Sequence, residues 1–315
     1  MKKKTIAIGL LVLSSGACSR TPSPAKVEAT TDAAPTASGV TSSGLTGDPD
    51  ACPGDAAKGV TCRRFATAED AFKHVVREDV QVLAVGEAHA QKGTEAIASS
   101  TKRFTEQLLP TIAPRSGDIV VELWAPDPKC QKEVKAVASA QKVVTETQAA
   151  TNTNEYQTLG VEAKKLGMTP WLLRPTCDDF SMLADAGADA VPSMLGLVKR
   201  LTQEKVTQLM GKNVPAKKLT IAYGGALHND IAPPPATAQW SFGPDLVKAT
   251  SGKYVELDLI VPEFVKKTET WEKLPWFASF MADEGPRTKA TLYTITTGAS
   301  TPPSHVLVFA SSPKP

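Results

Sequence analysis

The sequence has few of the residue patterns that mark several common kinds of functional site. It contains five cysteines, but no two of them stand in a Cys-x-x-Cys spacing, so a cysteine-ligated zinc site is not expected. A Gly-x-Ser-x-Gly motif is also absent, which argues against a serine nucleophile. Beyond the first residues, no apolar run is long enough to cross a membrane. The chemistry of this protein must therefore come from other residues.

An excess of positive charge is lacking too. The chain has 35 Lys and Arg against 33 Asp and Glu. Loss of Lys2, Lys3 and Lys4 with a signal peptide would leave 32 basic against 33 acidic residues, a net charge of −1. A nucleic-acid partner would require a basic face for its phosphates, so none is expected. We expect a small-molecule or peptide ligand instead.

The first residues have the parts of a secretory signal peptide. A basic start is followed by an apolar run from Ile6 to Leu13 and a small-residue exit, so residues 1–17 should be removed. Cys18 directly after Gly16-Ala17 resembles a lipobox, which predicts a lipidated Cys18 and a protein anchored in the bacterial cell envelope. The outer membrane is favoured, with the protein facing the periplasm or the exterior. The alternative is ordinary cleavage, which leaves Cys18 as a free thiol.

The chain after Cys18 divides into a tether and one domain. Residues 18–50 are Ser, Thr, Ala, Pro and Gly with scattered charge, and they have too few large apolar side chains to fold. Residues 51–312 suit a single α/β domain. The four cysteines of this domain can pair in three ways, in keeping with an oxidising compartment. We favour Cys52 with Cys62 and Cys130 with Cys177.

Helical and strand patterns alternate along the domain. Thr67 to Asp70 is typical of a capping box, and two β-rich runs separated by one helix form a βαβ unit. Such alternation predicts an α/β fold with a largely parallel sheet flanked by helices, and the last two strands form an antiparallel pair. Helices are expected over 68–78, 94–112, 128–147, 155–166 and 191–211, and strands over 80–85, 118–124, 169–174, 218–223, 254–261, 291–296 and 305–309.

Two of the four histidines stand in the same local setting. Each follows a β-rich run through a Gly-x-x-His motif, Gly86 to His89 and Gly225 to His228. Open parallel sheets bind ligands beyond the carboxyl ends of their strands, so both histidines should converge on one site. A glycine at the start of each motif allows a sharp turn or a close approach.

Two carboxylates accompany these histidines. Glu87 lies inside the first motif, and Glu122 lies near the end of the next strand between apolar neighbours. A carboxylate buried in such a strand needs a partner. The candidates are His89, His228, Arg174 and a bound metal.

The order of these motifs resembles a known superfamily. Val85 to His89, Val120 to Glu122 and Ala222 to His228 look like the group that joins the ChaN-type haem-binding lipoproteins, the TraB and Tiki metalloprotease-like proteins and the erythromycin esterases. The similarity covers about residues 80–228. It implies that His89, Glu122 and His228 share one cleft with Glu87 beside them. Esterase-type relatives use a His and a Glu to activate water, Tiki-type relatives need a divalent metal, and ChaN-type relatives hold haem.

Two functions of different class follow. The first is a hydrolase of the esterase or metallopeptidase kind, in which a histidine oriented by Glu122 or Glu87 activates water. In a variant of this mechanism, His89, His228 and Glu122 bind Zn²⁺ or Mn²⁺.

The second function is a lipoprotein that binds haem or another iron complex. Its axial ligand would be His89, His228 or Tyr223. Tyr223 and Arg174 are the candidate cofactor-binding residues. The alternative roles are packing against the sheet for Tyr223 and an ion pair with Asp178 for Arg174.

Overall fold

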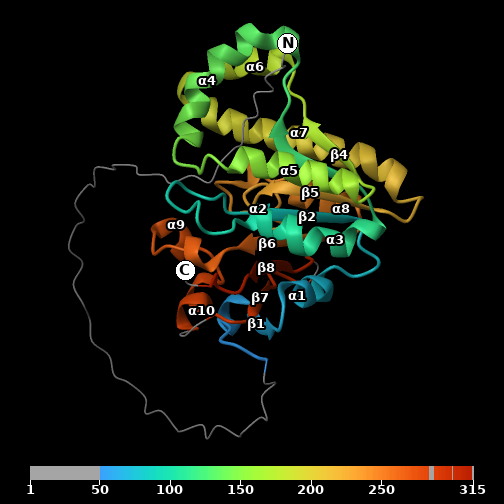
Figure 1. Ribbon diagram of the computed structural model, residues 1–315, viewed down its shortest axis with the longest axis vertical. Coiled ribbons are helices and arrows are strands. Elements are labelled where there is room, and N and C mark those ends of the chain that lie inside the picture. The colour runs from blue at the N-terminus through green and yellow to red at the C-terminus, as the bar shows by residue number, and fades with distance from the viewer. Residues whose placement is uncertain (1–49, 284–286, 300, 314–315) are drawn as a thin grey trace, which may run out of the picture.

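The computed structural model describes residues 50–283, 287–299 and 301–313. The predicted signal peptide, Cys18 and the tether as far as residue 49 lie outside these residues. Within them the strands form one eight-stranded sheet in the order β1-β7-β8-β6-β2-β5-β3-β4, flanked by helices (Figure 1). The prediction of an α/β fold is confirmed.

The sheet has a parallel part and an antiparallel edge. Five neighbouring strands of the parallel part are β2 (Val82–Glu87), β3 (Ser116–Trp124), β4 (Thr169–Leu173), β5 (Leu219–Gly225) and β6 (Tyr254–Ile260). Strand β8 (Ser304–Val308) extends the sheet in parallel to β6, whereas β7 (Ala290–Ile295) runs antiparallel to β8 and to β1 (Val60–Phe65). The predicted antiparallel pair at the end of the chain is thus confirmed.

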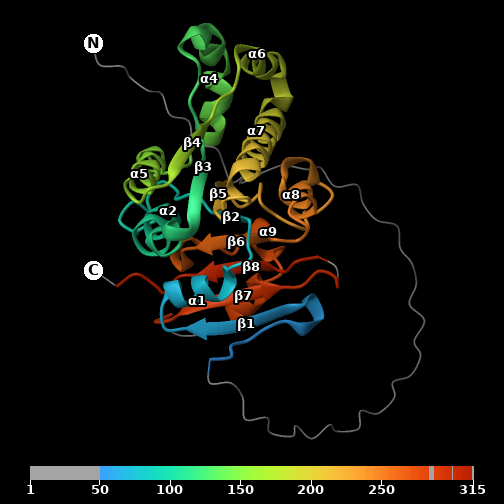
Figure 2. The same cartoon turned by 90° about the vertical axis from the view of Figure 1, so that its right-hand side faces the viewer.

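Helices cover both faces of the sheet. Their bounds are α1 (Ala68–Val75), α2 (Ser100–Arg103), α3 (Leu109–Ile112), α4 (Gln131–Thr145), α5 (Asn152–Lys165), α6 (Cys177–Asp185), α7 (Ala190–Asn213), α8 (Gly243–Ala249), α9 (Glu269–Glu272) and α10 (Phe277–Ala282). Alternate residues of β2 face opposite layers: Leu83 and Val85 pack on the side of α1 and α5, and Val82 and Ala84 pack on the side of α7. Helices α4 and α6 project beyond the sheet (Figures 1 and 2).

Several predicted boundaries differ from the structure, and three of the differences lie near the predicted site. The helix expected from residue 94 begins at Ser100, because the side chain of Ser99 accepts a hydrogen bond from Lys102 N at 3.0 Å and caps the helix there. A π-helical turn at Phe104–Leu108 then separates α2 from α3. Strands β2 and β5 each continue two residues further than expected, so Glu87 and Gly225 are strand residues.

Strand β1 was not predicted. Its sequence, Val-Thr-Cys-Arg-Arg-Phe, carries two arginines and a threonine, because only part of one face is covered and only one neighbouring strand, β7, pairs along its length. Edge strands that carry charge avoid pairing with other chains, and for the same reason they lack an apolar pattern. The open side of β1 is partly covered by the bridges of Ala51 with Arg63 and of Asp55 with Val60.

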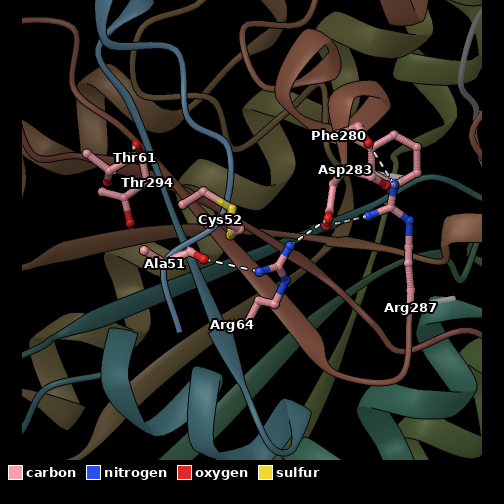
Figure 3. Close-up of a disulfide and its surroundings, with 9 residues drawn as sticks. Ala51, Cys52, Thr61, Arg64, Phe280, Asp283, Arg287 and Thr294 are labelled. Atoms are coloured by element: carbon pink, nitrogen blue, oxygen red, sulfur yellow. Dashed lines mark hydrogen bonds and ion pairs between the residues drawn. A yellow bond between two sulfur atoms is a disulfide. The ribbon is translucent and has the colours of Figure 1, made fainter. Parts of the chain in front are cut away.

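Both predicted disulfides are present. Cys52–Cys62 and Cys130–Cys177 have Cα–Cα distances of 5.2 and 5.0 Å. Cys130–Cys177 joins the segment before α4 to the start of α6. Cys52–Cys62 fastens the start of the domain to β1, where Arg64 donates to the carbonyl of Ala51 at 3.1 Å and to Asp283 at 2.6 Å (Figure 3).

Candidate functional site

The two Gly-x-x-His motifs lie at the carboxyl ends of two neighbouring parallel strands. Strands β2 and β5 are parallel neighbours, with Gly86 paired to Gly224 and Glu87 paired to Gly225. Strand β3, which carries Glu122, is the next neighbour of β5. Two His–Glu pairs form there: Glu87 with His89, and Glu122 with His228. All four residues are buried, with 1–3% of their surface exposed.

The first pair includes a tyrosine that the sequence analysis missed. Ring Nδ1 of His89 lies 2.8 Å from Oε1 of Glu87, and the hydroxyl of Tyr156 donates to the same oxygen at 2.9 Å. That hydroxyl also lies 3.3 Å from Nδ1 of His89. Tyr156 is in α5 and is 1% exposed. The three side chains form one buried hydrogen-bonded group that fixes the orientation of the His89 ring.

The second pair leaves two polar atoms facing each other. Oε2 of Glu122 accepts a hydrogen bond from Gly225 N at 2.8 Å. Oε1 of Glu122 lies 3.8 Å from Nε2 of His228, too far for a direct hydrogen bond. Within the described part of the chain, neither of these two buried atoms has a hydrogen-bond partner. Buried polar groups in native proteins are nearly always hydrogen-bonded, and here two such atoms face each other across the same gap, so the pair is a candidate binding point for a small polar group.

The tautomer of His228 follows from its other ring nitrogen. Nδ1 lies 2.8 Å from the carbonyl oxygen of Trp240. A carbonyl oxygen only accepts, so Nδ1 must carry the hydrogen. In the neutral ring, Nε2 then has the lone pair, and it faces Glu122. His228 is placed to accept a proton on the side of the carboxylate.

The two pairs interact electrostatically. Burial raises the pKa of Glu122, while the nearby charges of His228 and His89 oppose this rise and that of Glu87 adds to it. Burial also raises the pKa of the Tyr156 hydroxyl well above its ordinary value, and Glu87 adds to that shift. Tyr156 therefore stays protonated and keeps its hydrogen for Glu87.

Neither of the two predicted cofactor-binding residues has a described hydrogen bond to the His–Glu pairs. Tyr223 is 2% exposed, its hydroxyl donates to Oγ1 of Thr101 at 3.2 Å, and its ring packs against those of Phe104 and Tyr156. This is the packing role that the sequence left open. Arg174 follows β4 and is exposed, and no described hydrogen bond or ion pair connects it with the cluster or with Asp178.

The described residues do not provide the ligand set of the predicted metal ion. Over residues 50–283, 287–299 and 301–313, no three His, Cys, Asp or Glu side chains are arranged so that they could hold a metal ion. His89, Glu122 and His228 thus do not form the expected Zn²⁺ or Mn²⁺ site. The three predicted axial ligands of haem are each only 2% exposed and lie in a packed interior.

Comparisons with known proteins do not identify the chain. No protein-family model matches the sequence, and no curated protein or solved structure matches it. None of the described helices combines the length and the apolar character that a membrane span requires. The assignment of a function therefore depends on the geometry of the cluster.

Proposed function

We propose that this protein is an exported hydrolase in which His228 and Glu122 activate a water molecule. The observation that supports this proposal is the buried, unpartnered pair of Nε2 of His228 and Oε1 of Glu122, 3.8 Å apart. One water molecule between them would donate to Nε2 and satisfy Oε1 as well. A donor set for a metal ion is not required for this role.

The reaction would begin with proton transfer from this water. An O–H bond of the water breaks, the proton goes to Nε2 of His228, and the oxygen attacks the carbonyl carbon of an ester or amide. The C–O or C–N bond to the leaving group then breaks as the carbonyl re-forms, and the proton on His228 passes to the departing alcohol or amine. The carbonyl of Trp240 holds Nδ1–H throughout, so it keeps the ring in the reactive tautomer and stabilises the imidazolium.

The first pair would assist the second. Glu87 and Tyr156 hold the ring of His89 in place, and the charge of His89 acts on Glu122. A protonated His89 would stabilise negative charge that develops on the attacked carbonyl group. Since the cluster is buried, substrate entry requires movement of the segments that cover it.

The location of the protein in the cell envelope is part of the same proposal. The signal peptide, the lipobox-like Cys18 and the resemblance to the ChaN, TraB, Tiki and erythromycin-esterase superfamily support a lipid-anchored protein of the cell envelope, with an ester or peptide from outside the cytoplasm as its substrate. The two disulfides suit that compartment.

The proposal is tested by hydrolysis assays on the purified chain with p-nitrophenyl esters and fluorogenic peptides. We expect His228→Ala and Glu122→Gln each to lower kcat/KM at least about 100-fold, the usual contribution of a general base. His74→Ala is the control, because His74 is exposed on α1, away from the cluster. Activity that EDTA leaves unchanged would agree with the missing metal set.

Two results would contradict the proposal. One is wild-type turnover that persists in both variants, and the other is no turnover of any ester or peptide in the panel. Hemin titration in the same experiment tests the alternative function. A shifted Soret band that is lost in His89→Ala and His228→Ala would favour haem binding over hydrolysis.

A further inference from the structure

Strand β6 contacts the segment that directly follows His228. Tyr254, Glu256 and Asp258 stand two residues apart on this strand, so their side chains share one face of the sheet. On that face the loop after β5 folds over β2. A Cβ added at Gly86 would overlap the backbone of Ala226 and the side chains of Asn229 and Asp258. The absence of a side chain at Gly86 lets this loop lie against the sheet.

Each of the three β6 side chains makes a hydrogen bond with this loop. The hydroxyl of Tyr254 donates to the carbonyl of Asn229 at 2.6 Å. The amide of Ile231 donates to Oε2 of Glu256 at 2.6 Å, and Nδ2 of Asn229 donates to Oδ1 of Asp258 at 2.9 Å. Tyr254, Glu256 and Asn229 are 2–4% exposed, so these bonds lie in the protein interior.

The opposite side of His228 is fixed by the segment before α8. The backbone carbonyl of His228 accepts from Phe242 N at 2.8 Å and from the hydroxyl of Ser241 at 3.1 Å. The same hydroxyl lies 2.6 Å from the carbonyl of Asp230. Residues 228–231 are thus clamped between β6 on one side and Trp240 to Phe242 on the other.

We propose that Tyr254, Glu256 and Asp258 are positioning residues that set the orientation of His228 toward Glu122. The catalytic meaning of this inference rests on the proposed hydrolase function, but the orientation itself does not. The three side chains act through Asn229 and Ile231, and none of them has a described hydrogen bond or ion pair with His228 or Glu122.

The two carboxylates of β6 share their surroundings. Burial raises the pKa of Glu256 well above its ordinary value, and the charges of Asp258 and Asp230 raise it further. Burial raises the pKa of Asp258 to about 7, the hydrogen bond from Asn229 opposes this, and Asp230 adds to it. Among the described residues, the titratable groups that interact with Asp258 are Glu256, Asp230 and Tyr254. Substitution of a carboxylate by its amide keeps an accepting oxygen, whereas alanine removes it.

The test is NMR of the full chain labelled with ¹⁵N-histidine, which needs no substrate. The chain has four histidines, and each is assigned by its own His→Gln variant. In the wild type, the His228 ring should show a single tautomer with the hydrogen on Nδ1. We expect Glu256→Ala and Asp258→Ala to produce a mixture of tautomers at His228 and to leave the signals of His74, which is exposed on α1, unchanged. Glu256→Gln and Asp258→Asn should restore the wild-type pattern.

Folded alanine variants with an unchanged His228 pattern would overturn the inference. Should these variants not fold, Tyr254→Phe decides, because it removes a single hydroxyl; its His228 signals must also show the mixture. Where hydrolysis is measurable, Asp258→Ala should lower kcat at least about tenfold with KM unchanged. A changed tautomer without any hydrolytic activity would leave the positioning role intact and reject the hydrolase instead.

Discussion

The carboxylate of Glu122 fills the space that a side chain at Gly224 would occupy. A Cβ built on Gly224 would overlap Oε2 of Glu122. The two residues lie on adjacent parallel strands, β3 and β5, and the missing side chain lets the carboxylate reach the amide of Gly225. Gly224 is thus needed for close approach by a neighbouring side chain and not for an unusual backbone conformation.

Replacement of Gly224 by alanine should displace Glu122 and lower the free energy of unfolding by about 1–3 kcal/mol, the usual cost of overpacking. Urea unfolding of both proteins measures the difference. Gly211→Ala is the matched control, because a Cβ there meets nothing within 4 Å and the residue lies inside α7. That change should stabilise the protein by up to about 1 kcal/mol. Equal effects at the two positions would show that Glu122 does not lie over Gly224.

The two disulfides should contribute unequally to stability. Cys130–Cys177 spans 47 residues and Cys52–Cys62 spans 10. From loop-closure entropy, their contributions are about 4 and about 3 kcal/mol. We expect Cys130→Ala/Cys177→Ala to lose about 1 kcal/mol more in urea unfolding than Cys52→Ala/Cys62→Ala. The reverse order would mean that chain entropy does not dominate in this protein.

Asp258 should make the protein less stable as the pH rises from about 4 to about 7. Its pKa, raised by burial to about 7 in the folded protein, lies above the ordinary value of 3.8, so the folded state binds a proton that the unfolded chain has lost. Asp258→Asn should therefore gain stability relative to the wild type across this window, as measured by urea unfolding at several pH values. Asp185→Asn, at an exposed position of α6, should show no such trend.

His305 should have the opposite effect at acidic pH. Burial, with the positive charges of His74 and Arg77, lowers its pKa to about 4 from an ordinary 6.5. The unfolded chain then binds a proton that the folded protein does not, so stability is lost as the pH falls from about 6.5 to about 4. His305→Gln should remove this loss. An identical pH dependence in the wild type and the variant would argue that His305 titrates normally in the folded protein.

The sequence predicted the parts of the site that depend on strand position. His89 and His228 follow parallel strands that proved to be neighbours, and Glu122 lies in an apolar strand where a buried carboxylate needs partners. The partners themselves could not be read from the pattern. Tyr156 lies 67 residues from His89 on a helix whose spacing indicates only packing, and the partner of Nδ1 in His228 is a backbone carbonyl, which every residue has.

The fold was predictable where apolar periodicity is strong and was missed where it is weak. The buried parallel strands are nearly continuous apolar runs, but β1 carries charge, and α8 to α10 are only four to seven residues long. Arg174 shows the limit of position as a guide. Arg174 directly follows the carboxyl end of β4, on the same side of the sheet as the two histidines. However, β4 is the last strand in the order, and its end is exposed.

The Cys52–Cys62 bond also determines where mechanical load enters the domain. A pull on the chain ahead of Asp50 reaches Cys52 within two residues and passes through the sulfur bridge to Cys62, which is paired with Tyr293 of β7. This covalent route bypasses the loop between the two cysteines. A load applied from the N-terminal side would thus reach the antiparallel edge of the sheet, whereas β2, β5 and β3, which lead to His89 and His228 and contain Glu122, lie several strands away.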